Sequence, residues 1–95
     1  MKTPVITTDE FILYLENDNG FYFIHCDILK QWTKEVKKHL HKAFDSLTKE
    51  NGQPLYALHT PTDKKHEKFL KMFGFSYLKT IKGLDNNDYD IYVWR

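Results

Sequence analysis

The side chains best suited to chemistry are two histidines and a thiol. His25 and His59 each end a predicted strand, and Cys26 follows His25. A histidine pair beside a thiol could supply a general base and a nucleophile, or part of a metal site. Alternation along a strand sends His25 and Cys26 to opposite faces, and the sequence has no Cys-x-x-Cys or His-x-x-x-His spacing. We therefore predict no catalytic residue and no metal site and take both residues as ordinary strand-end histidines, with His25 and His59 as the candidate catalytic residues in the alternative.

Polar residues on the predicted helices offer a second kind of site, a surface for a partner. Lys34 and Lys38 lie on a lysine-rich helix face, and His66 lies on the polar face of a second helix. We take these three as candidate partner-binding residues; the alternative is that they are simply solvated. The chain carries 14 Lys and Arg against 13 Asp and Glu, a net charge of +1. This balance argues against a nucleic-acid partner and against electrostatic attraction to a membrane.

The sequence predicts strands and helices that would position the candidate site residues. Asn19-Gly20 between two aromatic runs is typical of a β-hairpin, and apolar residues at helical spacing predict two helices. The strands are expected at 10–17, 21–26, 55–59, 75–81 and 89–94, and the helices at 32–49 and 63–73. A strand–helix–strand crossover favours parallel neighbours, with hairpins at both ends. The expected fold is therefore α+β, a mixed sheet with two helices in the order ββαβαββ.

Length and composition predict one small globular domain, residues 1–95. The single cysteine cannot form an internal disulfide, which indicates a reducing compartment. The N-terminal residues lack the apolar core of a signal peptide, and no run approaches the ~18–20 apolar residues of a membrane span. We therefore expect a cytoplasmic protein without membrane contact. A short chain with 16% aromatic residues should also leave an apolar sheet edge uncovered, which predicts a homodimer or an obligate protein partner.

Residues 63–75, DKKHEKFLKMFGF, resemble the last helix of the GNAT superfamily of N-acetyltransferases, whose pattern is Asn-x-x-Ala-x-x-Phe-Tyr-x-x-x-Gly-Phe. Phe69, Gly74 and Phe75 match that pattern, and Gly74 is placed to end the helix in a left-handed conformation. Leu70 stands where the family has a tyrosine that commonly serves as general acid. The resemblance implies a truncated GNAT-like fold over about residues 10–94, in which position 70 has no proton to give.

The same family binds the pyrophosphate of coenzyme A with Gln/Arg-x-x-Gly-x-Gly/Ala, whose backbone N–H groups face the phosphates at a helix N-terminus. The corresponding residues 25–35 contain no glycine. Lys30, Thr33 and Lys34 are the candidate cofactor-binding residues, with Thr33 as the helix N-cap. Asp27 and Glu35 are negatively charged and would repel a pyrophosphate. We therefore predict no cofactor, with acetyl-CoA as the alternative.

A closer likeness connects the second helix to small GNAT-like internal virion proteins of short-tailed phages, which also lack the glycine loop. They resemble this chain in a histidine three residues before Phe-Leu-Lys and then Gly, here His66, 69–71 and Gly74. The resemblance implies a phage-encoded protein that acts by protein–protein contacts, as a virion component or as a modulator of a host factor in the host cytoplasm. The prediction is thus a GNAT-like protein that has lost catalysis, with a minimal acyl-CoA-dependent N-acetyltransferase as the alternative.

Overall fold

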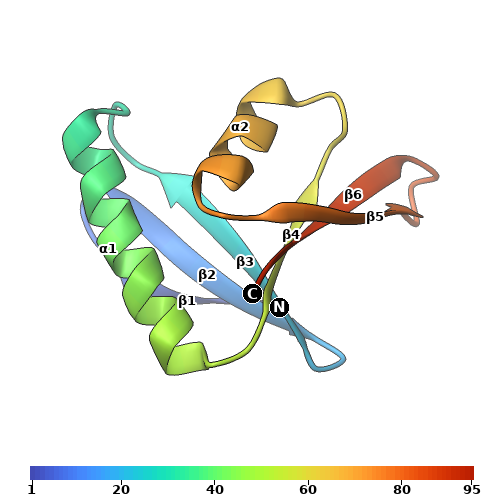
Figure 1. Ribbon diagram of the computed structural model, residues 1–95, viewed down its shortest axis with the longest axis horizontal. Coiled ribbons are helices and arrows are strands. Elements are labelled where there is room, and N and C mark those ends of the chain that lie inside the picture. The colour runs from blue at the N-terminus through green and yellow to red at the C-terminus, as the bar shows by residue number, and fades with distance from the viewer. The chain divides into compact units, whose positions relative to one another are not determined.

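The computed structural model describes all residues, 1–95, as six strands and two helices (Figure 1). In chain order they are β1 (Lys2–Thr7), β2 (Phe11–Asp18), β3 (Phe21–Ile28), α1 (Lys34–Asn51), β4 (Leu55–His59), α2 (Lys64–Met72), β5 (Ser76–Lys82) and β6 (Asp88–Trp94). The predicted order ββαβαββ runs from β2 to β6, and β1 precedes it. The chain forms two compact units, Met1–Gln53 and Pro54–Arg95, which are described in turn. The single domain expected for residues 1–95 stays a prediction.

The N-terminal unit contains a three-stranded antiparallel sheet built around the predicted hairpin. Asn19 and Gly20 close the turn between β2 and β3 with φ values of 55° and 90°, the left-handed conformations that an Asn-Gly hairpin turn requires. Pairing continues as far as Ile28, which lies opposite Phe11. Because β3 extends beyond residue 26, the prediction that His25 ends its strand is wrong: His25 lies inside β3.

Strand β1 was not predicted. It pairs antiparallel with β2, with a register shift between Pro4 and Ile6. Nearly all of β1 is exposed. A strand with no buried face needs no alternation of apolar and polar residues, and that alternation is the pattern by which a half-buried strand is predicted. Proline cannot donate a ladder hydrogen bond and is confined to sheet edges and bulges. These features make β1 an edge strand whose outer side is poorly suited to further pairing.

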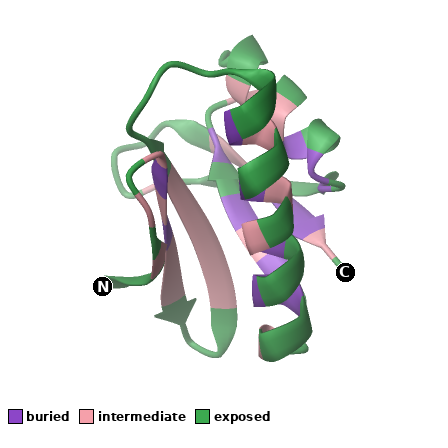
Figure 2. Ribbon diagram, turned by 90° about the vertical axis from the view of Figure 1, so that its left-hand side faces the viewer, coloured by how far each residue is buried: buried purple, intermediate pink, exposed green.

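Helix α1 is capped at both ends, and its N-cap is Thr33, as expected. The Val36 N–H donates to Thr33 Oγ1 at 3.1 Å, and Gly52, with φ 65°, ends the helix by donating its N–H to Thr48 O. The predicted start at residue 32 is wrong, because Trp32 precedes the cap and is 41% exposed. The buried residues of the helix are Val36, Leu40, Phe44, Leu47 and Thr48. Figure 2 shows buried positions along one side of α1 and exposed positions along the other.

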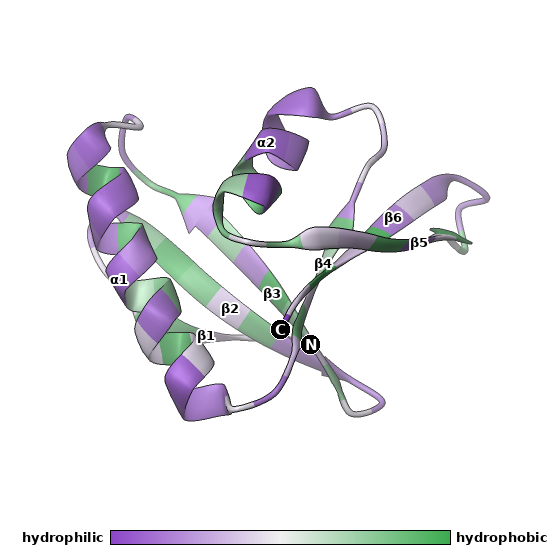
Figure 3. Cartoon of the chain, in the orientation of Figure 1, coloured by the Kyte–Doolittle hydropathy of each residue, from purple (hydrophilic) through white to green (hydrophobic).

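The C-terminal unit is an antiparallel sheet in which β6 lies between β4 and β5. Helix α2 is short and consists largely of hydrophilic residues (Figure 3), and it buries Leu70. Asp63 and Phe73, the predicted ends of this helix, are its caps, and Gly74 follows with φ 87°. The side-chain oxygen Oδ1 of Asp63 accepts the backbone N–H of His66 at 3.1 Å. No helix of the structure has the length and apolar character needed to cross a membrane.

Candidate functional site

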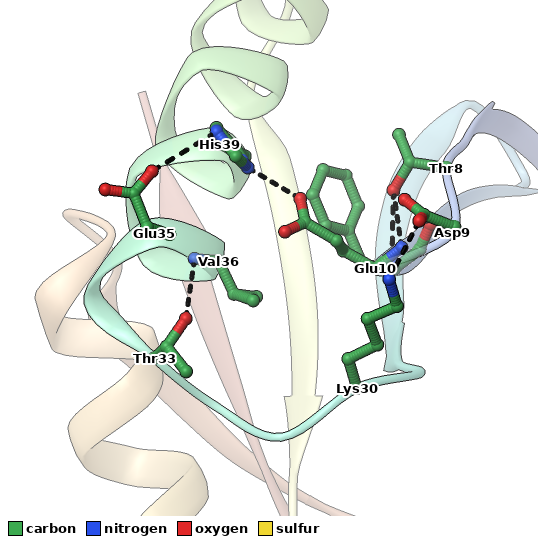
Figure 4. Close-up of polar contacts among 9 residues, drawn as sticks. Thr8, Asp9, Glu10, Lys30, Thr33, Glu35, Val36 and His39 are labelled. Atoms are coloured by element: carbon green, nitrogen blue, oxygen red, sulfur yellow. Dashed lines mark hydrogen bonds and ion pairs between the residues drawn. The ribbon is translucent and has the colours of Figure 1, made fainter.

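The candidate cofactor-binding residues lie where β3 turns into α1: Lys30 and Thr33 are in the turn, and Lys34 is the first residue of the helix. Lys30 Nζ lies 2.8 Å from Asp9 Oδ2 in the loop before β2 (Figure 4). Their hydrogen bond and opposite charges raise the pKa of Lys30 and lower the pKa of Asp9. The hydroxyl of Thr33 is occupied as the cap of α1. Two of the three candidate cofactor-binding residues therefore already have partners within the protein.

Carboxylates surround the first turns of α1. Glu10 Oε1 lies 2.6 Å from His39 Nδ1, and Glu35 Oε2 lies 3.7 Å from His39 Nε2. Asp9 stands nearby, paired with Lys30. A helix N-terminus attracts anions through its free N–H groups and its dipole, and these carboxylates compete for that attraction. Since the turn also has a side chain at every residue, its residues do not fit a bound pyrophosphate.

His25 and Cys26 do not form a nucleophilic site. His25 Nε2 lies 3.0 Å from Glu16 Oε1 on β2, and this hydrogen bond lowers the pKa of Glu16. Burial, assisted by the charge of Asp27, raises the pKa of Cys26 to about 11. The thiolate is the reactive form of cysteine, so Cys26 is protonated and inert at neutral pH. His25 is therefore engaged with Glu16 on the sheet of the N-terminal unit.

The structure brings together His59, a candidate catalytic residue from the sequence, and His66, a candidate partner-binding residue. His59 is the last residue of β4, and His66 lies in the first turn of α2. Their Nδ1 atoms are 2.9 Å apart, and their ring centroids are 5.0 Å apart. The ring of Tyr92, on β6, meets the His59 ring edge-on with centroids 5.3 Å apart. Since Asp63 accepts the backbone N–H of His66, the helix cap also fixes the position of this pair.

His59 is 1% exposed, and its Nε2 atom is buried without a hydrogen-bond partner. An unsatisfied buried polar group costs about 1–3 kcal/mol, so such groups are rare in native proteins. Burial lowers the pKa of His66, the proximity of His59 lowers it further, and Asp63 opposes both effects. His66 is therefore uncharged at neutral pH. In one tautomer of the pair, His59 donates through Nδ1 and leaves Nε2 as a bare acceptor that could take a proton.

The sheet face that carries His59 has further polar side chains. Asp90 on β6 lies opposite His59 in the register, so both side chains leave the same face. Thr80 Oγ1 donates to Asp90 Oδ1 at 2.7 Å, and the Tyr77 hydroxyl lies 2.8 Å from Thr80 Oγ1. Sequence reasoning missed these residues. The available signal was the period of two along β6, which places residues 90, 92 and 94 on one face.

The remaining candidates lie outside any catalytic grouping. Lys34 and Lys38 are exposed on α1, and Leu70 is 4% exposed and part of the core. A hollow of about 410 Å³ between β1, β2 and the end of α1 has Glu50 among mostly apolar residues. No three or more His, Cys, Asp or Glu side chains are grouped so that they could hold a metal ion.

Comparison with solved structures identifies the fold. A ribosomal-protein-S5-alanine acetyltransferase from Vibrio fischeri is 14% identical with a TM-score of 0.69, over 88% of this chain and 52% of that one. Naa50 from Arabidopsis thaliana, in complex with the bisubstrate analogue CoA-Ac-MVNAL, is 19% identical with a TM-score of 0.61, over 90% of this chain and 63% of that one.

The chain therefore spans 52% and 63% of the lengths of these two neighbours. No protein-family model matches the sequence, and no curated protein matches it. At such low identity the likeness shows the fold alone. It confirms the predicted fold class, an α+β, truncated GNAT-like mixed sheet with two helices.

Proposed function

We propose that this chain is a GNAT-like module that acts by contacts with a partner protein and has lost acyl transfer. The observation that carries the proposal is the start of α1, where side chains take the place of a phosphate-binding turn. Lys30 pairs with Asp9, Thr33 caps the helix, and Glu10 and Glu35 stand beside its first turns. An anion site at a helix N-terminus depends on backbone access and positive charge, and this arrangement limits both.

The surface we assign to the partner is a basic stripe on the exposed side of α1, made of Lys34, Lys38 and Lys42. The three lysines are four residues apart and exposed, so they are neighbours on the helix surface. None of them forms an ion pair within the protein. Like charges at this spacing destabilise a helix by about 0.2–0.5 kcal/mol per pair. An acidic partner would neutralise this repulsion, which is why we infer acidic side chains on the partner.

In its finer form the proposal is a phage-encoded protein that works in the particle or on a host factor in the host cytoplasm. It rests on the resemblance of His66, 69–71 and Gly74 to internal virion proteins. Self-association as a homodimer belongs to the same proposal. Its support is β5, which pairs on one side with β6 and exposes Tyr77 and Leu78 by 56% and 40%.

Charge reversal tests the assigned surface. The variant Lys34→Glu with Lys38→Glu should lose a partner that the wild type retains in an affinity capture from the native host. The matched control is Lys64→Glu with Lys68→Glu on α2, which makes the same change of charge and should retain the partner. All three proteins should have the same stability within about 0.5 kcal/mol per substitution. If both double variants retain the partner, or both lose it, the basic stripe is not the binding surface.

A second candidate function is a minimal N-acetyltransferase that uses acetyl-CoA, and one observation favours it. The unpartnered Nε2 of His59 could accept the proton of an attacking amine once the buried ring is uncovered. Positioning with backbone polarisation of the thioester can accelerate transfer without a side-chain acid. Incubation with acetyl-CoA and a peptide mixture, followed by mass spectrometry, tests it. Acetylated product that disappears in His59→Asn but persists in His41→Asn would replace the binding module with the enzyme.

A further inference from the structure

The hydrogen bond between His59 and His66 limits how many protons the pair can hold. Two Nδ1 atoms 2.9 Å apart share a hydrogen bond only if one carries a proton and the other is bare. Two imidazolium rings would instead direct two N–H groups at each other and place like charges in contact. The folded arrangement therefore admits at most one proton beyond the neutral pair.

The surroundings of the pair do not relieve this limit. On α2, Asp63 favours a charge on His66, but burial and the proximity of His59 act against it and lower the pKa of His66 overall. On β6, Asp90 lies opposite His59 but accepts a hydrogen bond from Thr80. Glu67, on α2, is paired with Lys71, and the uncharged ring of Tyr92 packs against His59 in a T-shaped contact.

In the unfolded chain, or when the pair is open, both histidines can take up a proton. The closed pair cannot, so acid favours the open state. Both histidines of an opened pair titrate near the ordinary value of 6.5. A folded pKa below that value contributes stability that is fully present above pH ~6.5 and is lost as the pH falls through the folded pKa. Below about pH 5.5 both rings of the opened pair are charged, so the opened pair holds two protons more than the neutral pair. The closed pair holds at most one more. Each proton of difference multiplies the opening equilibrium about tenfold per pH unit.

We propose that the His59–His66 hydrogen bond is an acid-sensitive latch, which holds the first turn of α2 on β4 at neutral pH and releases it in acid. The latch joins the two elements directly, because His59 ends β4 and His66 lies beside the N-cap of α2. When the latch opens, His66 moves away from the buried ring of His59. Water can then reach the unsatisfied Nε2 atom of His59. This regulation is independent of the proposed partner and of any acyl transfer.

Amide hydrogen exchange followed by NMR between pH 7 and pH 5 tests the latch on the intact protein. After correction for the intrinsic pH dependence of exchange, the protection of α2 amides should begin to fall below pH ~6.5 and should fall about tenfold per pH unit below pH ~5.5. The protection of α1 amides should change much less. In His66→Asn the amide side chain can keep a hydrogen bond to His59 without titrating, so the protection of α2 should become nearly independent of pH.

The control is His41→Asn, which removes a histidine from α1 and should leave the acid response of α2 unchanged. Equal pH dependence in His66→Asn and the wild type would overturn the proposal, as would wild-type α2 protection that stays flat down to pH 5. If His66→Asn fails to fold, an NMR titration of the wild-type histidine rings decides. Uptake of a second proton by the pair with α2 still fully protected would equally overturn the latch.

Discussion

Gly74→Ala should destabilise the protein more than Gly20→Ala, and the difference isolates the contact between residue 74 and Trp94. The two glycines have nearly the same left-handed backbone, with φ 87° and 90°. A Cβ at position 20 meets nothing within 4 Å, whereas a Cβ at position 74 comes 3.3 Å from Trp94 Cδ1 and 3.5 Å from its Nε1. The strain of the backbone is thus shared by both variants, and the crowding is not.

The magnitudes follow from these two terms. A left-handed alanine costs about 1–2 kcal/mol, and the smaller entropy of the unfolded alanine chain returns about 0.4–1 kcal/mol. Gly20→Ala should therefore lose about 1 kcal/mol. Carbon atoms pack best at about 3.5–4.0 Å, so Trp94 must move in Gly74→Ala. Crowding of this kind costs typically about 1–3 kcal/mol more.

Urea denaturation of the two variants and the wild type measures the difference. An additional loss of about 2 kcal/mol lowers the midpoint by roughly 1 M when the slope is ~2 kcal/mol/M. Equal midpoints for Gly74→Ala and Gly20→Ala would show that Trp94 yields without cost. That result would contradict the close packing of residue 74 against Trp94, but not the left-handed conformation of Gly74.

Further outcomes follow from the core, the cap of α1 and the thiol. Phe44→Ala should lose about 3–5 kcal/mol in urea denaturation, because Phe44 is 5% exposed; an unchanged midpoint would contradict its place in the core. Thr33→Ala should lose about 1 kcal/mol, whereas Thr33→Ser should keep the cap; equal losses would show that the hydroxyl does not cap α1. Cys26, with a pKa of about 11, should react slowly with iodoacetamide at pH 8 and faster once unfolded; fast reaction of the folded protein would contradict its burial.

Local signals in the sequence located most of the fold because each has a direct backbone meaning. Asn19-Gly20 fixed the hairpin through its left-handed conformations, and Thr33 marked the start of α1 because its hydroxyl accepts a backbone N–H of the helix. β1 was missed for the converse reason. It is an exposed edge strand with Pro4 and a register shift, so its pairing depends on β2 and not on its own residues.

The candidate site was harder to foresee because it depends on contacts between elements. His59 was selected as a strand-end residue and His66 as a residue on a polar surface, yet they share a hydrogen bond across seven residues of sequence. Helical spacing places His66 about 100° around the helix from its neighbours Lys65 and Glu67, but it does not show which strand the helix covers. Asp90 and Tyr92 required the register of β6 against β4, which a single sequence does not provide.

The central claim, that this GNAT-like chain has lost its acyl-CoA chemistry, is tested most directly by thermal unfolding with and without acetyl-CoA. A ligand present at 100 times its dissociation constant stabilises the folded state by about 2.7 kcal/mol. For a domain of this size, each kcal/mol raises the Tm by roughly 4–8 °C, so binding would be conspicuous. We predict no change in Tm up to millimolar acetyl-CoA, because the turn before α1 has neither glycine nor a free lysine at Lys30. A saturable rise of about 10 °C or more would contradict the account and favour the enzyme.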